Sequence, residues 1–214
     1  MNGRTVYQRR QALAFRLDSD RFTATLGKGL TRILVQVSAR NGPISFHVRF
    51  RRTSSKAEHE KLTQAALGRQ GDVERGRKLF LNAEKSQCIK CHRIGDQGER
   101  IGPELTGVGA RFSRIFLIES ILEPSRTIAP SYQTVLVVLR DGRQLAGIKV
   151  VESERMLTLA DNQGQKHVLA KADIDEQRPV PQSTMPDGLE KRLTTDEFVD
   201  LIAFLVSLKE TRPR

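Results

Sequence analysis

Both cysteines of the chain lie in one short stretch, Gln87-Cys88-Ile89-Lys90-Cys91-His92. Two residues separate the thiols, and a histidine directly follows the second one. Cys-x-x-Cys-His is typical of a site where haem is attached covalently. Two thiols about one turn apart can reach both vinyl groups of one haem, and the next imidazole can then take an axial position on the iron. The motif therefore predicts one covalent haem c, bound through Cys88 and Cys91 with His92 as an axial ligand.

Three other interpretations of the motif remain open. A thioredoxin-like redox pair would not need His92 and should follow a strand in a βαβ setting, whereas the preceding segment, 73–83, has a helical pattern. A zinc site of this spacing needs two more ligands. No further cysteine exists, and the other histidines are scattered along the chain, at His47, His59 and His167. The third interpretation is two buried cysteines beside a chance histidine.

The composition favours a basic globular protein. The chain has 214 residues, enough for one or two domains with cores of their own, and a formal net charge of +11. Such a charge is typical of proteins that bind nucleic acid, an anionic surface or an acidic protein. We find no nucleic-acid motif, and the Lys and Arg residues are spread along the chain. The sequence therefore favours a solvated basic surface over nucleic-acid binding, with an acidic redox partner as an intermediate option, and it predicts no nucleic-acid binding.

Apolar runs are short throughout the sequence. None approaches the roughly 18 residues that a membrane-spanning helix needs, so we expect no transmembrane segment. The N-terminal region offers only the apolar run 12–15, so no signal peptide is visible. Haem c is attached outside the cytoplasmic membrane, so the motif nevertheless predicts a periplasmic or otherwise exported protein. We therefore expect a truncated or miscalled start, or a fragment of a longer exported chain.

Residues 1–52 have a β-rich pattern, with apolar alternation at 12–17, 21–26, 33–37 and 44–50. Asn41-Gly42 is a turn signal and predicts a hairpin over 31–51. The stretch 28–35 resembles the closing strands of a carbohydrate-binding β-sandwich, which would make 1–52 the end of a larger domain. Residues 53–70 are polar and charged, and we expect a linker or an exposed helix there.

Helical patterns flank the motif. Asp72 is a suitable N-cap for a helix over about 73–83, in which Gly76 suggests a close helix crossing. A second helix should begin after Ser113 and end before Pro124. The last helix should begin after Thr194, which forms a capping-box pattern with Glu197.

Two further stretches complete the region. Gly102-Pro103 predicts a turn, and the carbonyl of Pro103 could accept a hydrogen bond from the imidazole N–H of His92 and so orient the ring. Short apolar strands at 134–139, 145–151, 156–159 and 167–169, separated by Asp-Gly and Asn/Gly turns, predict a small antiparallel β unit within about 131–181. An irregular loop follows at 179–189.

Taken in order, these features resemble a mono-haem c-type cytochrome domain: helix, Cys88-x-x-Cys91-His92, Gly102-Pro103-x-Leu105, helix, Met185-Pro186, terminal helix. With a β insertion before the methionine, the chain is similar to the haem-binding domain of the planctomycete and verrucomicrobial type, which the stretches 123–132 and 185–189 also resemble. The resemblance covers about 71–210. It implies an α+β protein: an all-α cytochrome c core carrying a β insertion at about 131–181, preceded by the β-rich fragment.

The resemblance also implies that His92 is the proximal ligand and Met185 the distal one, and that Gly76 and Phe80 cross the final helix near Phe204. Elimination agrees on Met185, because Met1 is terminal and Met156 lies in a strand-like run. With both axial positions filled, no substrate can bind iron and the reduction potential is raised. The expected function is electron transfer by a carrier module that is not itself an enzyme.

The expected partner is a fused or docked periplasmic oxidoreductase, and the parent chain of such modules often carries a dehydrogenase-like or sugar-binding-like domain. Five basic residues close to the motif in sequence could steer an acidic partner: Lys85, Lys90, Arg93, Arg100 and Arg111. Two alternative functions remain. The first is a haem sensor or peroxidase-like enzyme with an open sixth position, and the second is a glycan-binding module in which the haem is auxiliary.

Overall fold

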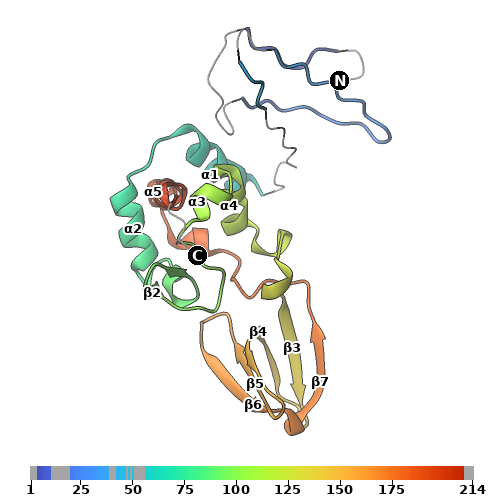
Figure 1. Cartoon of the computed structure of the whole chain (residues 1–214), viewed down its shortest axis with the longest axis vertical. Coiled ribbons are helices and arrows are strands. Elements are labelled where there is room, and N and C mark those ends of the chain that lie inside the picture. The colour runs from blue at the N-terminus through green and yellow to red at the C-terminus, as the bar shows by residue number, and fades with distance from the viewer. Residues whose placement is uncertain are drawn as a thin grey trace. The chain divides into compact units, whose positions relative to one another are not determined.

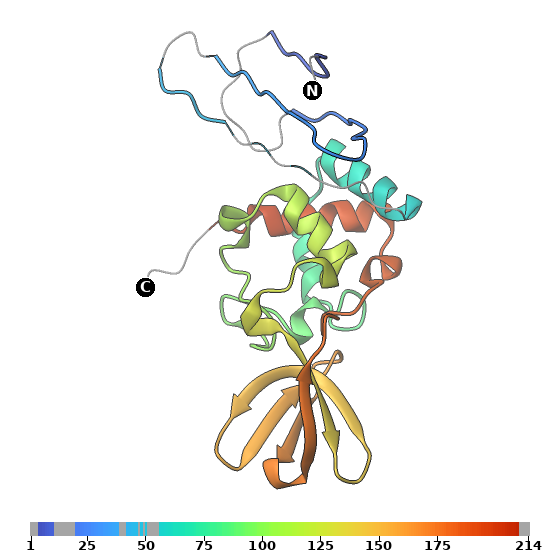
Figure 2. The same cartoon turned by 90° about the vertical axis from the view of Figure 1, so that its right-hand side faces the viewer.

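The computed structural model describes residues 4–10, 20–38, 42–46, 48, 50 and 56–209. The chain divides into two units, Met1–Thr53 and Ser54–Arg214. The second unit combines helices with an antiparallel sheet, as Figures 1 and 2 show. It therefore has the α+β character that the sequence predicts.

The described residues of the first unit contain no strand. The predicted strands at 21–26 and 33–37 are absent, the one at 12–17 lies outside the described residues, and 44–50 is described only in part. Tyr7 stacks on Phe22 with 5.2 Å between the ring centroids, but Leu30 and Leu34 are 94% and 87% exposed. An isolated hairpin is marginal without an apolar face to pack against. This exposure gives a physical reason why the described residues do not show the predicted hairpin.

The described residues of the second unit form five α-helices: α1 (Ala57–Gly68), α2 (Val73–Leu81), α3 (Val108–Arg111), α4 (Arg114–Leu122) and α5 (Thr195–Ser207). Helix α5 contacts each of the other four. Seven of its residues are buried, among them Phe198 and Ile202, which are fully buried. The C-terminal helix is therefore the centre of the helical core.

Helix α1 occupies the segment for which a linker or an exposed helix was expected. It packs against α4 and α5, and its buried residues are His59, Thr63 and Ala66. The hydroxyl of Thr63 donates to the carbonyl of His59 at 2.7 Å, which satisfies it within the helix. The expectation of an exposed segment is therefore wrong. The buried face is built from small and polar side chains, which apolar periodicity does not detect.

Helices α2 and α5 cross at a glycine, as expected. A Cβ atom at Gly76 would lie 2.0 Å from the carbonyl oxygen of Asp200 and 2.7 Å from Cβ of Phe204. The rings of Phe80 and Phe204 pack beside this point, with 5.8 Å between their centroids. Only a residue without a side chain allows the two backbones to come this close.

Polar groups fix the start of α2 on α5. Asp72 caps the helix by accepting from the Arg75 backbone N–H at 2.8 Å. The Asp200 carboxylate accepts from the Asp72 N–H and from Nε of Arg75, both at 2.7 Å. Burial acts to raise the pKa of Asp200, but these donors outweigh it and the pKa is lowered. The buried carboxylate is thereby kept ionised and paired.

The sheet is antiparallel, with strand order β6-β5-β4-β3-β7. Its strands are β3 (Thr134–Leu139), β4 (Gln144–Glu152), β5 (Met156–Ala160), β6 (Lys166–Ala170) and β7 (Ile174–Pro179). Val137, Leu157 and Leu159 are buried in its core. The edge strand β7 was not predicted, because its sequence Ile-Asp-Glu-Gln-Arg-Pro has no apolar alternation and ends in a proline, which an edge strand tolerates.

Short elements connect the helices and the sheet. Two two-residue strands, β1 (Arg93–Ile94) and β2 (Gln97–Gly98), follow the cysteine motif in the chain and pair with each other. The 3₁₀ turns are η1 (Cys88–Lys90), η2 (Pro124–Arg126), η3 (Pro130–Tyr132), η4 (Lys171–Asp173) and η5 (Leu189–Arg192). In Figure 2 the green loops that carry the cysteine motif lie between the helices and the sheet.

Replacing Gly76 by alanine tests the crossing. The added Cβ would collide with α5 backbone, so we expect Gly76→Ala to lower the free energy of unfolding by about 1–3 kcal/mol or more. The matched control is Gly68→Ala, where a Cβ meets nothing within 4 Å. Equal effects of both substitutions in denaturant titrations of the protein would contradict the role of Gly76.

Candidate functional site

The motif is folded as one tight turn. Gln87 has a φ of 62°, in the left-handed region, and it leads into η1. The backbone N–H groups of Cys91 and His92 both donate to the carbonyl of Cys88, at 3.2 and 2.9 Å. Cys88, Cys91 and His92 are therefore held within a single turn, the arrangement that attachment of two thiols to one haem needs.

The two thiols are unbridged and partly buried. Cys88 packs against the helical core, while Cys91 packs against a cluster formed by Ile101, Ile148 and Ala160. Burial raises the pKa of both thiols, and the carboxylate of Asp161 raises the pKa of Cys91 further. Reactive dithiols have a lowered pKa instead. These surroundings, and the helix α2 that precedes the motif, differ from those of a thioredoxin-like redox pair.

The imidazole of His92 is oriented by a backbone carbonyl. Nδ1 of His92 lies 2.9 Å from the carbonyl oxygen of Pro103. A carbonyl only accepts, so Nδ1 carries the hydrogen and Nε2 keeps a lone pair for a metal. Burial lowers the pKa of His92, partly opposed by the Pro103 hydrogen bond. This is the geometry anticipated for Pro103, which reaches the ring through its carbonyl.

The loop that follows the motif is fitted closely to His92. A Cβ at Gly102 would lie 2.8 Å from Cε1 and 3.0 Å from Nδ1 of the His92 ring. The Gly102 N–H donates to the carbonyl of Cys91 at 2.7 Å. Gly98 has a φ of +96°, and its Cβ would lie 2.1 Å from the carbonyl oxygen of His92. The glycines therefore allow backbone to pack directly on the histidine.

The sheet also contacts the motif. In the turn between β5 and β6, Gly164 has a φ of +80°, and a Cβ there would lie 2.8 Å from the carbonyl oxygen of Lys90. Lys166 pairs with Glu99 at 2.9 Å. Ile148 of β4 and Ala160 of β5 form the cluster against which Cys91 packs. The sheet thus covers the side of the motif where Cys91 lies.

Met185 lies in the irregular segment between β7 and η5. It is partly buried and packs against the helical core, the same cluster that Cys88 contacts. Met156, by contrast, is 39% exposed on β5. The structure therefore brings Met185 and Cys88 to one apolar cluster, from opposite ends of the sequence region.

These residues fit a haem c. The two unbridged thiols lie one turn apart, and the engaged Nδ1 of His92 leaves Nε2 as the nitrogen that would bind iron. Gly102 leaves the ring edge uncrowded. A zinc site finds less support, because no group of three or more His, Cys, Asp or Glu suited to a metal occurs among the described residues.

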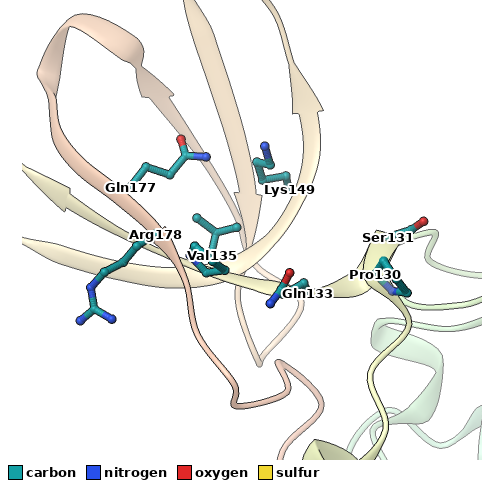
Figure 3. A pocket seen from close by; sticks show the side chains of 8 residues that line it. Pro130, Ser131, Gln133, Val135, Lys149, Gln177 and Arg178 are labelled. Atoms are coloured by element: carbon teal, nitrogen blue, oxygen red, sulfur yellow. The ribbon is translucent and has the colours of Figure 1, made fainter.

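Two surface hollows lie elsewhere, at the end of the sheet where β3 begins and β7 ends. The larger, about 390 Å³, is lined by η3 residues and by β3, β4 and β7, and Figure 3 shows Val135, Lys149 and Gln177 around it. The second, about 340 Å³, is lined by Ser125, Ile128, Pro130, Gln133, Val180 and Pro181. Neither hollow is lined by the cysteines, His92 or Met185.

Gly102 and Pro103 provide a matched test of how His92 is positioned. Gly102→Ala would push a Cβ into the imidazole, so we expect the haem-loaded protein to lose about 1–3 kcal/mol of unfolding free energy and to shift its reduction potential. Pro103→Ala keeps the carbonyl acceptor, so its cost should stay below about 1 kcal/mol with the potential unchanged. Denaturant titration and redox titration measure both. A Pro103→Ala protein with the larger potential shift would contradict the assignment.

Comparison with known proteins agrees with this chemistry. Residues 73–135 match the family model described as Cytochrome c. No curated protein matches the chain. No helix in the described residues is long and apolar enough to cross a membrane. The match covers α2, the cysteine motif and α4, and it supports a c-type cytochrome domain that transfers electrons through a covalently bound haem.

Proposed function

We propose that this chain carries one haem c, bound through Cys88 and Cys91 with His92 and Met185 as axial ligands, and that it serves as an electron carrier. The observation that carries the proposal is the hydrogen bond from His92 Nδ1 to the carbonyl of Pro103 at 2.9 Å. It fixes the tautomer in which Nε2 can bind iron, within the turn that also holds both thiols. The family match over 73–135 supports the same cofactor.

Met185 is proposed as the distal ligand because of its position. Its thioether belongs to a partly buried side chain in the cluster that Cys88 contacts, whereas Met156 lies on a sheet strand. Met/His ligation raises the reduction potential and leaves no open position for a substrate. When bound, the haem supplies the redox chemistry. The chain's own residues attach it, orient His92 and exclude water.

The partner proposed is an acidic protein, docked to this chain or fused to it, in a periplasmic or otherwise exported setting. Three of the five basic residues near the motif are engaged within the chain: Lys85 pairs with Glu197, Arg93 pairs with Asp96, and Arg111 donates to the carbonyls of Glu104 and Gly107. Arg100 is exposed. Steering by the remaining charges would give an association rate that falls as salt rises.

Covalent attachment is tested first. The chain is exported in cells that carry a haem-maturation system, and intact mass and a pyridine haemochrome spectrum are recorded. We expect the mass of one haem to be added and retained under denaturing conditions. Cys88→Ala and Cys91→Ala should each remove one thioether, and the double variant should lose covalent haem altogether. A haem-free wild-type product carrying dithiol activity would overturn the proposal.

Met185→Ala tests the sixth ligand. We expect loss of the weak absorption band of thioether–iron ligation in the oxidised protein, a lower reduction potential and rapid carbon monoxide binding by the reduced protein. Met156→Ala is the control and should leave all three unchanged. Rapid, stoichiometric carbon monoxide binding by the wild type would favour a sensor or peroxidase-like protein with an open position instead.

A further inference from the structure

The segment that carries Met185 has no regular structure of its own. It runs from the end of β7 at Pro179 to the start of η5 at Leu189. Its first residues are hydrogen-bonded to the start of β3 and to η2: the Val180 N–H donates to the carbonyl of Thr134 at 3.0 Å, and the Ser183 N–H donates to Oγ of Ser125 at 3.0 Å. The backbone path of this segment is therefore fixed by hydrogen bonds to other segments of the chain.

A buried hydroxyl pair lies next to the methionine. Oγ1 of Thr184 is 2.7 Å from Oγ1 of Thr134, and the two residues are only 6% and 4% exposed. Thr134 is the first residue of β3, so this contact joins the β insertion to the residue directly before Met185. Each hydroxyl satisfies the other where water has little access, so removing one leaves the other unpaired.

The other end of the segment is anchored on α1. After Gly188, whose φ is +82°, Oε1 of Glu190 lies 3.1 Å from Nε2 of His59, and both residues are 4% exposed. Thus Met185 lies between two buried polar contacts, Thr184–Thr134 on one side and Glu190–His59 on the other. Neither contact involves the cysteine motif.

We propose that the β insertion positions Met185, with Thr134 and Thr184 as the positioning residues. This inference rests on the proposed function, in which the Met185 thioether is the distal ligand. A methionine side chain has three rotatable bonds, so its sulfur stays in an axial position only if the backbone beneath it is fixed. The hydroxyl pair fixes that backbone to the first strand of the sheet. The insertion thereby contributes to ligation without supplying a ligand.

The test uses the full haem-loaded chain and measures how fast added imidazole displaces the native sixth ligand of the oxidised protein. Thr184→Val keeps the shape of the side chain but removes the hydroxyl, and we expect displacement to become about 10-fold faster. Thr184→Ser keeps the hydroxyl and should stay within about threefold of wild type. The double variant Thr134→Val/Thr184→Val replaces both partners by apolar groups and should recover most of the loss.

Two further measurements separate positioning from general stability. In a Met185→Ala background, Thr184→Val should no longer change the rate of imidazole binding, because it acts through the methionine. Amide hydrogen exchange should rise at residues 180–188 in Thr184→Val and not in Ser113→Ala, which removes the N-cap of α4 instead. An effect of Thr184→Val that persists without Met185 would overturn the inference.

The outcomes distinguish this inference from the proposal beneath it. If Met185→Ala leaves the thioether band unchanged, the proposed ligation itself fails. If Met185→Ala abolishes the band while Thr184→Val leaves imidazole displacement unchanged, only the positioning role fails. Should Thr184→Val fail to load haem, a double variant Thr134→Val/Thr184→Val that loads supports the hydroxyl pair, and a double variant that also fails overturns it.

Discussion

The close approach of backbone to helix α5 is the constraint on which the second unit depends. Cβ atoms at Gly71, Gly76 and Gly109 would lie 2.5, 2.0 and 2.3 Å from carbonyl oxygens of α5. Only glycine permits this distance, so the stretch from Gly71 into α2 and helix α3 can both pack against one helix without side chains between them. Because α2 leads into the cysteine motif and α5 follows the Met185 segment, the crossing at Gly76 brings two distant parts of the chain together. The positions of the two proposed axial ligands, His92 and Met185, therefore depend on the packing of α2 against α5.

The β insertion is accommodated because its two ends are neighbours. Its first strand, β3, pairs antiparallel with its last, β7, and Val135 is opposite Pro179. The chain therefore leaves the helical core and returns to it at nearly the same place, so α4 and α5 can pack as though no sheet lay between them. The sheet nevertheless stays in contact with the core, through Gly164 beside Lys90 and through Ile148 and Ala160 beside Cys91. It covers one side of the motif with apolar residues.

Local signals explain which elements could be predicted from the sequence. The caps Asp72, Ser113 and Thr194 each accept from a backbone N–H within three residues, so the starts of α2, α4 and α5 are as predicted. Elements that depend on contacts with distant residues carry no such local signal. Helix α1 buries a face of small and polar residues, and β7 is a polar edge strand. The sequence at 31–51 contains a turn signal, but a turn does not provide the apolar surface that a hairpin needs to pack against. The left-handed Gln87 was not predictable either, because glycine usually takes that conformation.

The same division applies to the site. The motif's chemistry follows from residue types and spacing, and the Pro103 carbonyl was anticipated because a proline keeps its acceptor while lacking a donor. What the sequence could not supply is the support around Met185. Thr184 and Thr134 are 50 residues apart, and Glu190 and His59 are 131 apart. Threonine hydroxyls and a lone glutamate are common enough that no spacing singles them out. Only folding reveals that both pairs are buried, and burial is what makes each hydrogen bond costly to remove. A ligand can therefore be named from a motif, whereas the residues that hold it in place become visible only when distant segments are seen in contact.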